Sequence, residues 1–493
     1  MWQNIFNCSL AITTFLTVVV FILVHLYLRT VHSYWAKRKV PFEKPRFLVG
    51  SLWEVFKGKK QIGKHLGQLY GKFKGNPYFG IYILGKPYLV LRKPEIIKRI
   101  AIKDFKNFED RTFACDKTAD EMAGNSLFIL RNPEWRNIRN KLSPIFTGGK
   151  IRHMIPFMTE TAKEMQNYLD NNNGNVLDMK DVAGRFMTDL VAKCFFGLES
   201  NSFKRGNMDF RRACVRFFEF SIYRTICLFS YFFVPKLVSI FKLQLFDTDY
   251  FKKVFLETLS FRQETGLKRN DFVDLLINIK EHNVNLNFDT TSMVAQAITF
   301  LVAGFETTSN LLAFALYELS LRPDCQEKLR SEILKNATGT YEEVQHIKYL
   351  DMVISETLRR YPFGPFLNRN CKEDYIIQET GLKIEKNTPI LIPLDGIHFD
   401  PEFYEEPLKF EPERFRNGYK HLLNTCVYMP FGLGPRNCIG DRFGQIGAKV
   451  GLVYFLKHFR VEKCEFTQTP LILDPRTPFM VPIGGLKLKV TKI

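Results

Sequence analysis

The run from Asp289 to Leu321 constrains the fold more than any other stretch of the chain. It is apolar on nearly every side, begins with an aspartate suited to cap a helix, and is followed by Pro323. As a helix, its roughly 32 residues would extend about 48 Å, and a helix that is apolar all round must be buried. Unpaired polar groups in mid-run would be costly in lipid; here they are Gln296, Glu306, Thr307, Thr308 and Asn310. The run therefore predicts a helix through the centre of a large domain rather than a membrane span.

The composition suits such a domain. The 493 residues are 46% hydrophobic and include 47 phenylalanines, which is ample for a large core and too apolar for a disordered chain. Most of the middle has helical patterning, whereas β-type alternation is confined to residues 78–92, 376–394 and 482–490. We predict a mostly α fold with a smaller β portion (α+β). No internal repeat or long linker follows residue 50, so one domain over residues 51–493 is expected.

The amino-terminal stretch predicts a membrane anchor. Residues 5–28 are uncharged and largely apolar, and their length matches the ~20 residues that cross a bilayer as a helix. The basic residues that follow should stay in the cytosol by the positive-inside rule; they are Arg29, Lys37, Arg38 and Lys39. We expect an uncleaved transmembrane helix within residues 1–28 and a basic, proline-rich linker over residues 29–50. A buried core helix is the alternative interpretation.

Charge and cysteine usage narrow the class of protein. The formal charge of +19 favours an acidic protein or an anionic membrane face as partner. No basic-aromatic ladder or zinc-finger spacing is present, so we expect no nucleic-acid partner. The ten cysteines occur singly, without a Cys-x-x-Cys pair, which indicates a reduced, intracellular protein rather than a disulfide scaffold.

Cys438 lies in a segment with distinctive chemistry. Two glycines and a proline precede it within residues 431–438, which predicts a tight turn that lets backbone approach a flat ligand closely. A cation at Arg436 would lower the pKa of the thiol and favour the metal-binding thiolate, and a helix expected over residues 441–456 adds positive potential at its amino end. A single anionic sulfur without neighbouring ligands does not suit zinc, but it suits haem iron. A structural cysteine in a glycine-rich loop is the alternative.

The same segment resembles the Phe-x-x-Gly-x-Arg-x-Cys-x-Gly signature of the cytochrome P-450 superfamily. The matching residues are Phe431, Gly434, Arg436, Cys438 and Gly440. The chain looks most like microsomal, xenobiotic-metabolising insect family six enzymes. The resemblance implies the cytochrome P-450 fold and a haem b (iron protoporphyrin IX) with Cys438 as its axial iron ligand. It also implies a monooxygenase that inserts one oxygen atom of O2 into a lipophilic small molecule, xenobiotic or endogenous.

The middle of the long helix resembles the oxygen-activation motif of that family. The motif covers residues 303–308. By resemblance, Thr307 holds dioxygen by a hydrogen bond, Glu306 relays protons, and Ala303 lies beside the haem. The alternative is a helix-interior threonine that bonds back to the carbonyl four residues earlier.

Further motifs imply a scaffold and a haem clamp. Glu356 and Arg359 resemble the family's Glu-x-x-Arg motif, and Arg414 in residues 410–415 completes a three-way buried network that we assign to folding. The family's haem-contacting positions correspond to Trp135, Arg139, Arg369, Arg436, Phe431, Gly432, Cys438, Gly440 and Ala303. For Arg369 the alternative is a surface arginine.

The resemblance places aromatic and apolar residues around a substrate pocket. These are Phe113, Phe300, Phe363, Phe366, Leu367 and Phe479, for which core packing is an equally good explanation. Residues 217–220 and 229–235 are rich in aromatics and are interpreted as a surface that dips into the membrane, with core packing as the alternative. Consecutive prolines of the family are replaced here by residues 362–365, Pro-Phe-Gly-Pro, which leaves the substrate's shape open.

Electrons should come from another protein, because the chain has no Gly-x-Gly-x-x-Gly dinucleotide fingerprint. By resemblance this partner is the NADPH-cytochrome P-450 reductase of the endoplasmic reticulum, with cytochrome b-five as an optional donor and the catalytic domain facing the cytosol. A basic docking face is expected from Arg136, Lys141, Arg442 and Lys449. Two rival functions are a haem-thiolate isomerase or dehydratase that uses no dioxygen, and a silent haem-binding membrane protein.

Overall fold

The computed structural model describes residues 2–204, 208–282, 288–336 and 340–493. Its α-helices are α1 (Trp2–His32), α2 (Tyr34–Lys37), α3 (Trp53–Phe56), α4 (Ile62–Lys72), α5 (Pro94–Lys98), α6 (Glu121–Gly124), α7 (Glu134–Leu142), α8 (Gly148–Asp170), α9 (Met179–Val191), α10 (Asp209–Arg216), α11 (Ile222–Phe233), α12 (Pro235–Phe241), α13 (Asp249–Thr265), α14 (Phe272–His282), α15 (Thr290–Ser320), α16 (Pro323–Asn336), α17 (Tyr341–His346), α18 (Lys348–Arg360), α19 (Leu394–His398), α20 (Lys420–Asn424) and α21 (Asp441–His458). Its strands are β1 (Tyr78–Ile83), β2 (Lys86–Leu91), β3 (Val176–Asp178), β4 (Phe366–Asn370), β5 (Tyr375–Ile376), β6 (Lys383–Ile384), β7 (Pro389–Pro393), β8 (Phe459–Glu462) and β9 (Lys487–Lys492). The predicted mostly α fold with a smaller β portion is confirmed.

The largest sheet joins the amino-terminal hairpin to strands from late in the chain. Its order is β1-β2-β7-β4; β2 and β7 run parallel, whereas the two outer pairs are antiparallel. Leu84 and Gly85 both have positive φ at the turn between β1 and β2, as a two-residue hairpin turn matched to strand twist requires. The β-type alternation in residues 78–92 corresponds to this hairpin, and that in residues 482–490 to the start of β9.

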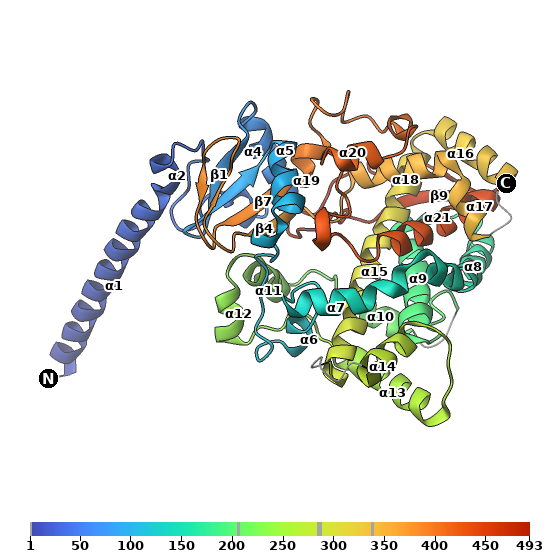
Figure 1. Cartoon of the computed structure of the whole chain (residues 1–493), viewed down its shortest axis with the longest axis horizontal. Helices are drawn as coiled ribbons and strands as arrows, with labels where there is room; N and C mark the ends of the chain where they lie inside the picture. Colours follow the sequence, from blue (N-terminus) through green and yellow to red (C-terminus); the bar gives the residue numbers. More distant parts are fainter. Residues whose placement is uncertain (1, 205–207, 283–287, 337–339) are drawn as a thin grey trace.

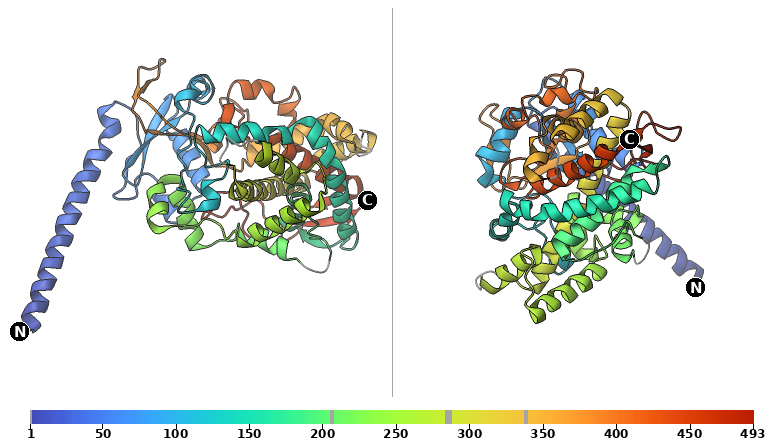
Figure 2. Two further views of the ribbon diagram at one scale, coloured as in Figure 1. Left: turned by 60° about the horizontal axis from the view of Figure 1, so that its bottom comes forward. Right: turned by 90° about the vertical axis from the view of Figure 1, so that its right-hand side faces the viewer.

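Helix α15 runs through the middle of the helical part of the molecule (Figures 1 and 2). The Asp289 carboxylate accepts a hydrogen bond from the Ser292 amide and caps its start. Its most apolar 18-residue window is 72% buried inside the protein. The interpretation of this run as a core helix is therefore confirmed.

Helix α1 projects away from the rest of the molecule, beyond the β1 sheet (Figures 1 and 2). The stretch Leu10–Lys37 is long and apolar enough to cross a membrane; its most apolar 18 residues have a mean hydropathy of 2.3, and none of them is buried. A buried core helix is therefore excluded for this segment. Just after it, Trp35 is buried against Gly80, where a Cβ would lie 2.3 Å from the indole. This contact joins the base of α1 to the sheet.

Candidate functional site

In the loop that carries Cys438, the backbone at Gly434 has a conformation and a close contact that only glycine allows. Gly434 has φ +66°, and a Cβ there would lie 2.1 Å from the Ala101 carbonyl oxygen. The Cys438 amide donates a hydrogen bond of 2.8 Å to the Phe431 carbonyl and closes the turn. Helix α21 begins three residues after the cysteine, as the sequence predicted. The sequence thus builds a short, closely packed turn with the thiol at its end.

The surroundings of Cys438 differ from those expected. The residue is exposed, yet burial raises the pKa of its thiol, opposed by the Gly440 amide and by the charges of Arg139 and Arg111. An accessible sulfur that is nevertheless surrounded by protein must face an internal hollow rather than bulk water. The expectation that Arg436 lowers this pKa was wrong, because its guanidinium binds other groups. Ligation by a metal would itself remove the proton.

The hollow has a second wall on α15. Ala303 is exposed in the middle of this buried helix, and Thr299 and Thr307, one turn to either side, are partly exposed. Residues spaced by four lie on one helix face, so these three form an accessible stripe. The next part of α15 crosses α21 close to Cys438: a Cβ on Gly444 would lie 3.3 Å from the Thr308 hydroxyl. The accessible stripe and the accessible thiol therefore lie at the same helix crossing.

Trp135 and Arg436 come together beside the cysteine loop. The Arg436 guanidinium lies 3.8 Å above the Trp135 ring. It donates to the carbonyls of Glu109 (2.8 Å) and Leu130 (2.9 Å) and to the Asp110 carboxylate (3.0 Å). Burial is the main reason that its pKa falls to about 9.

Arg139 and Arg369 reach the same loop from α7 and β4. Arg139 donates to the backbone carbonyl and the side-chain oxygen of Asn437 at 2.8 and 2.9 Å. Arg369 is only 2% exposed, which excludes the alternative of a surface arginine, and burial lowers its pKa to about 10. It donates to the Leu433 carbonyl at 3.1 Å, while its buried Nε has no hydrogen-bond partner within the described residues.

Sequence reasoning missed a fourth arginine, Arg111. Its two terminal nitrogens donate to the carbonyls of Arg436 (3.1 Å) and Phe128 (2.9 Å). Its pKa is lowered well below the usual range, first by burial and then by the charges of Arg369 and Arg436. No motif marks Arg111; its only signal in the sequence is that it lies two residues before Phe113, which was assigned to the pocket.

These four guanidiniums and the thiol fit a haem. Asp110 is the carboxylate that pairs with Arg436. The charges of Arg369 and Arg436 lower the pKa of Arg111, which indicates an excess of positive charge, and the buried Nε of Arg369 has no hydrogen-bond partner within the described residues. Buried carboxylates require such charge-assisted donors, so the two propionates of a haem match this cluster. The accessible thiol would then ligate the iron, with the stripe on α15 beside the ring.

Glu306 and Thr307 point in different directions. The Thr307 hydroxyl donates to the Ala303 carbonyl at 2.5 Å, which is the back-bonding alternative named above; its lone pairs remain able to accept. Glu306 is buried and forms a 2.9 Å ion pair with Lys180 of α9. Lys180 also donates to the Ser309 hydroxyl at 2.9 Å, and burial lowers its pKa despite the nearby carboxylate. Lys180, 126 positions earlier in the printed sequence, carried no sequence signal.

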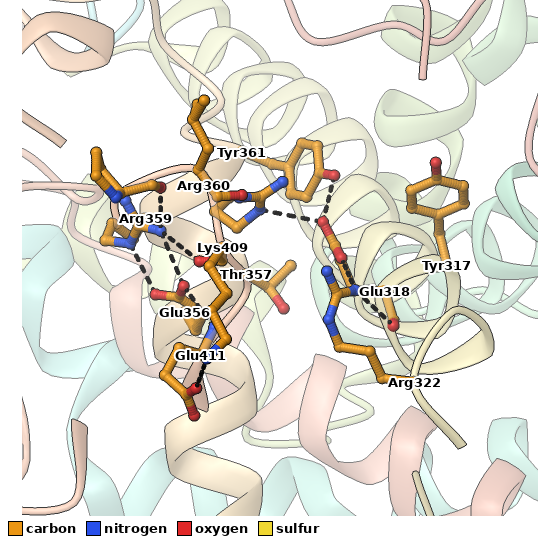
Figure 3. Close-up of polar contacts among 12 residues, drawn as sticks. Tyr317, Glu318, Arg322, Glu356, Thr357, Arg359, Arg360, Tyr361, Lys409 and Glu411 are labelled. Carbon is orange, nitrogen blue, oxygen red and sulfur yellow. Dashed lines mark hydrogen bonds and ion pairs between the residues drawn. The ribbon is translucent and has the colours of Figure 1, made fainter. Parts of the chain in front are cut away.

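Glu356 and Arg359 form a fully buried ion pair on α18 (Figure 3). Arg359 holds both carboxylate oxygens at 2.7 and 2.8 Å and also donates to the carbonyls of His398 and Pro407. Arg414 lies at the edge, 3.7 Å from the carboxylate and without a hydrogen bond to it. The predicted three-way network is thus present as one strong pair with a weaker third member.

A second polar cluster adjoins the Glu356–Arg359 pair, and His398 connects Arg359 to the chain that leads to the cysteine loop. Arg360 and Tyr361 bind Glu318 at 3.1 and 2.5 Å (Figure 3). His398 accepts from the Met429 amide at 3.0 Å and faces the Arg359 carbonyl at 3.1 Å. Accepting at one nitrogen requires the neutral ring, and burial lowers the pKa of His398 to about 3.

The expected pocket residues fall into three groups. Phe363 and Phe479 stack with ring centres 4.6 Å apart. Phe113 and Phe366 both contact Phe232 of α11, and Leu367 lies beside Gly432 of the cysteine loop. Phe300 is enclosed by the rings of Phe146, Phe195 and Phe272, so its surroundings favour the core-packing alternative.

Two surface expectations need correction. Lys449 cannot belong to a docking face, because its side chain is only 7% exposed and pairs with Asp351; Arg136, Lys141 and Arg442 are exposed. Phe217 is a core residue packed on Phe246 and Phe251. Of the two predicted ranges, 217–220 has an exposed aromatic residue in Phe220, whereas the aromatics of 229–235 are buried or packed against the core. The other exposed apolar residues of this region are Ile222, Tyr223, Ile226, Ile240 and Phe241.

The chain is similar to known proteins over almost its whole length. The cytochrome P-450 family model matches residues 40–490. Cytochrome P-450 6k1 of Blattella germanica is 37% identical over 518 aligned positions, which cover 99% of this chain and 98% of that protein. Cytochrome P-450 6j1 of the same species is 36% identical, with 96% of both chains covered. Probable cytochrome P-450 6a13 of Drosophila melanogaster is 36% identical over 95% of this chain and 96% of its own length.

Replacing Arg359 should disrupt folding far more than replacing Arg414. Arg359→Leu leaves Glu356 as an uncompensated buried charge, which typically costs about 3–5 kcal/mol of folding free energy. Arg414→Leu removes a partner at 3.7 Å that makes no hydrogen bond to Glu356, so a smaller loss is expected. The yield of folded protein and its thermal unfolding, followed by tryptophan fluorescence, measure both. Equal losses in the two variants would contradict this ranking.

Proposed function

The chain belongs to the cytochrome P-450 family and is a haem-thiolate monooxygenase, and we propose that it inserts oxygen into a lipophilic small molecule with electrons that come from NADPH through a reductase. The observation that carries the proposal is the accessible Cys438 thiol in an internal hollow, bordered by four arginines. The Cys438 thiolate would hold the haem, which would supply redox-active iron for chemistry with dioxygen.

The arginines hold and orient the cofactor in this proposal. Arg111, Arg139, Arg369 and Arg436 bind the propionates, and the Trp135 ring under Arg436 fixes that guanidinium. Phe431, Gly432 and Gly440 border the cysteine in the loop, where small or closed backbone lets a flat ring approach. The arginines thereby gain the anionic partners that their repulsion requires.

We assign proton delivery to Glu306 and Thr307, two neighbouring residues of α15 that lie in different surroundings. Thr307, on the accessible stripe, holds its hydroxyl over the hollow through the bond to the Ala303 carbonyl. Glu306 is held in a buried ion pair with Lys180. To move a proton toward the hollow, Glu306 must leave Lys180, take up a proton from solvent and donate it to the Thr307 hydroxyl. The presence of both groups favours oxygen chemistry over an isomerase or dehydratase, and over a silent haem protein.

The substrate class follows from the aromatic lining. Phe113 and Phe366 both contact Phe232, and Leu367 lies beside Gly432 of the cysteine loop. Apolar pockets bind ligands of matching character. NADPH- and reductase-dependent product formation from a lipophilic compound, with incorporation of one atom of labelled O2, distinguishes this function from the two rivals.

The redox partner is expected to dock on the face that carries Cys438. Arg136 and Lys141 on α7 and Arg442 on α21 are exposed cations near the loop, and they would attract an acidic protein. We propose NADPH-cytochrome P-450 reductase for this role, with cytochrome b-five as an optional second donor.

The protein's membrane is proposed to be that of the endoplasmic reticulum, with the catalytic domain in the cytosol. Helices α11 and α12 lie at the same end of the molecule as α1 (Figures 1 and 2). Both carry exposed apolar side chains, among them Ile222 (71%) and Ile240 (69%). We propose that α1 spans the bilayer and that this second surface dips into it.

The thiolate assignment predicts a clear spectral result. The reduced, carbon-monoxide-bound protein should show the red-shifted Soret band of thiolate-ligated haem, and Cys438→Ser should lose it. Cys426→Ser is a matched control, since Cys426 is buried among apolar side chains whereas the Cys438 thiol is accessible. A Cys438→Ser variant that keeps the band would refute the assignment.

The Lys180–Glu306 pair predicts an effect on coupling. Lys180→Met should leave Glu306 as a buried carboxylate without its cation, so that the side chain no longer keeps the position set by the ion pair. Because the carboxylate that would relay protons is displaced, we expect product formed per NADPH consumed to fall several-fold. Lys193→Met is the control, since Lys193 is a buried lysine paired with Glu160 at the end of the same helix region. Unchanged coupling would contradict the proposal.

Membrane association should depend on two surfaces. Deletion of residues 2–28 should leave part of the protein in the membrane fraction at low salt, because the α11–α12 surface remains. Adding Ile222→Ser and Ile240→Ser to this deletion should release the protein. The measurement is the distribution between membrane pellet and supernatant, and complete release by the deletion alone would leave no role for the second surface.

A further inference from the structure

Residues 111–130, here called the wall segment, connect the arginine cluster to the aromatic pocket. The segment begins at Arg111 and includes helix α6. Its Phe113 ring stacks on Phe128 (centres 5.2 Å apart) and meets Phe232 of α11 at 4.1 Å. The position of this segment therefore decides the shape of one side of the proposed pocket.

Gln296 attaches the wall segment to α15. This residue is fully buried. Its side-chain oxygen accepts from the Leu127 amide at 3.0 Å, and its nitrogen donates to the Asn125 carbonyl at 2.6 Å. The Gln296 amide thus supplies hydrogen-bond partners for two backbone groups of the wall segment. We call this contact the inner attachment.

Asp120 attaches the same segment to α11 and to the chain after α12. One carboxylate oxygen accepts from the Tyr231 hydroxyl at 2.7 Å and from the Leu245 amide at 3.1 Å. The other accepts from the Ala123 amide at 2.9 Å. Asp120 and Tyr231 are 6% and 2% exposed. Each of these three bonds comes from an uncharged donor, and we call this contact the outer attachment.

The two attachments differ in how firmly they are packed. Gln296 lies on the central helix within the large core. The outer attachment belongs to a separate small cluster of Ala119, Ile129, Tyr231 and Val238. Regions with few buried apolar contacts open at lower free energy than the core. Opening should therefore occur at the outer attachment, with the inner attachment kept.

The outer attachment also lies between the exposed apolar surface of α11 and the aromatic wall of the proposed pocket. Tyr231 and Phe232 are neighbours on α11, the first bonded to Asp120 and the second in contact with Phe113. The same helix carries the exposed Ile222 and Ile226, at the end of the molecule from which α1 projects (Figure 1). A molecule passing from that surface to the aromatic wall must separate α11 from the wall segment.

We propose that Gln296, Asp120 and Tyr231 are specificity-determining residues of this enzyme: Gln296 fixes the pocket wall, and the Asp120–Tyr231 bond must break for a lipophilic substrate to enter. This inference rests on the proposed function. A bond that closes an entrance is present both before and after binding, so its loss speeds entry and exit alike. A bond that shapes the wall changes the bound state itself, and its loss alters affinity and the position of oxidation.

The first test measures ligand binding to the full-length, haem-loaded protein by stopped flow. The probe is 4-phenylimidazole, a lipophilic nitrogen ligand whose binding to haem iron moves the Soret band. Tyr231→Phe keeps the ring and removes the hydroxyl, and we expect association and dissociation rates to rise together by roughly 3- to 10-fold, the effect of one hydrogen bond. The dissociation constant should change less than 2-fold. Tyr250→Phe, at a partly exposed tyrosine of α13, should leave both rates unchanged.

Gln296→Leu should change the affinity rather than both rates together. Because the wall loses its attachment, we expect the dissociation constant for 4-phenylimidazole to rise by roughly 3- to 10-fold, chiefly through faster dissociation. Tyr231→Phe rates equal to those of the unmodified protein would overturn the entrance assignment. A Gln296→Leu variant with unchanged affinity would overturn the wall assignment.

Amide hydrogen exchange tests the same attachments without reference to ligand or turnover. In Tyr231→Phe, exchange should accelerate at Ala123 and Leu245, whose amides bind Asp120, and stay slow at Leu127, whose amide binds Gln296. Gln296→Leu should accelerate exchange at Leu127. Uniform acceleration across the domain would overturn the inference. An unmodified protein that takes up no haem would instead refute the proposed function, so the two failures are distinguishable.

Discussion

The buried pair of Glu356 and Arg359 is the interaction on which the site depends. Both side chains are fully buried, so each charge must be matched by bonds, and removing either partner leaves an uncompensated charge. The same residues hold the chain that leads to the cysteine: Glu356 accepts from the Glu411 amide, and Arg359 donates to the His398 carbonyl. His398 then accepts from the Met429 amide, two residues before the loop starts. Helix α18 and the cysteine loop are therefore positioned as one unit.

The charges around the Cys438 loop are not balanced within the protein, unlike those of the Glu356–Arg359 pair. Around Glu356 the charges are matched by the protein, whereas around Cys438 the arginines repel one another and the thiol's pKa is raised. An anionic ligand that brings its own metal would relieve both conditions, since propionates pair with guanidiniums and iron binds the thiolate. Ligands that bind only the folded state stabilise it. Cofactor binding is thus part of what stabilises this region of the fold.

What the sequence could predict was local. The cap at Asp289, the turn at Gly434 and the spacing of Glu356 and Arg359 each depend on neighbouring residues, so the printed order reveals them. Arg111 and Lys180 reach the site from elements far away in the chain, and no spacing rule marks them. Lys449 was misassigned because a lysine on α21 has no sequence feature that says whether it faces water or Asp351. Arg436 was found, but the direction of its guanidinium depends on packing against Trp135.

Helix geometry explains how α15 serves two environments. Successive residues on a helix are rotated by about 100°, so Glu306 and Thr307, although adjacent, face a buried cation and the hollow respectively. Residues spaced by three or four share a face, which places Gln296 in line with Thr299, Ala303 and Thr307. The face that borders the hollow therefore also carries the attachment of the wall segment. Because Gln296 and the residues that border the hollow share this face, we expect a change in how the wall segment is held to alter the place where the substrate would lie.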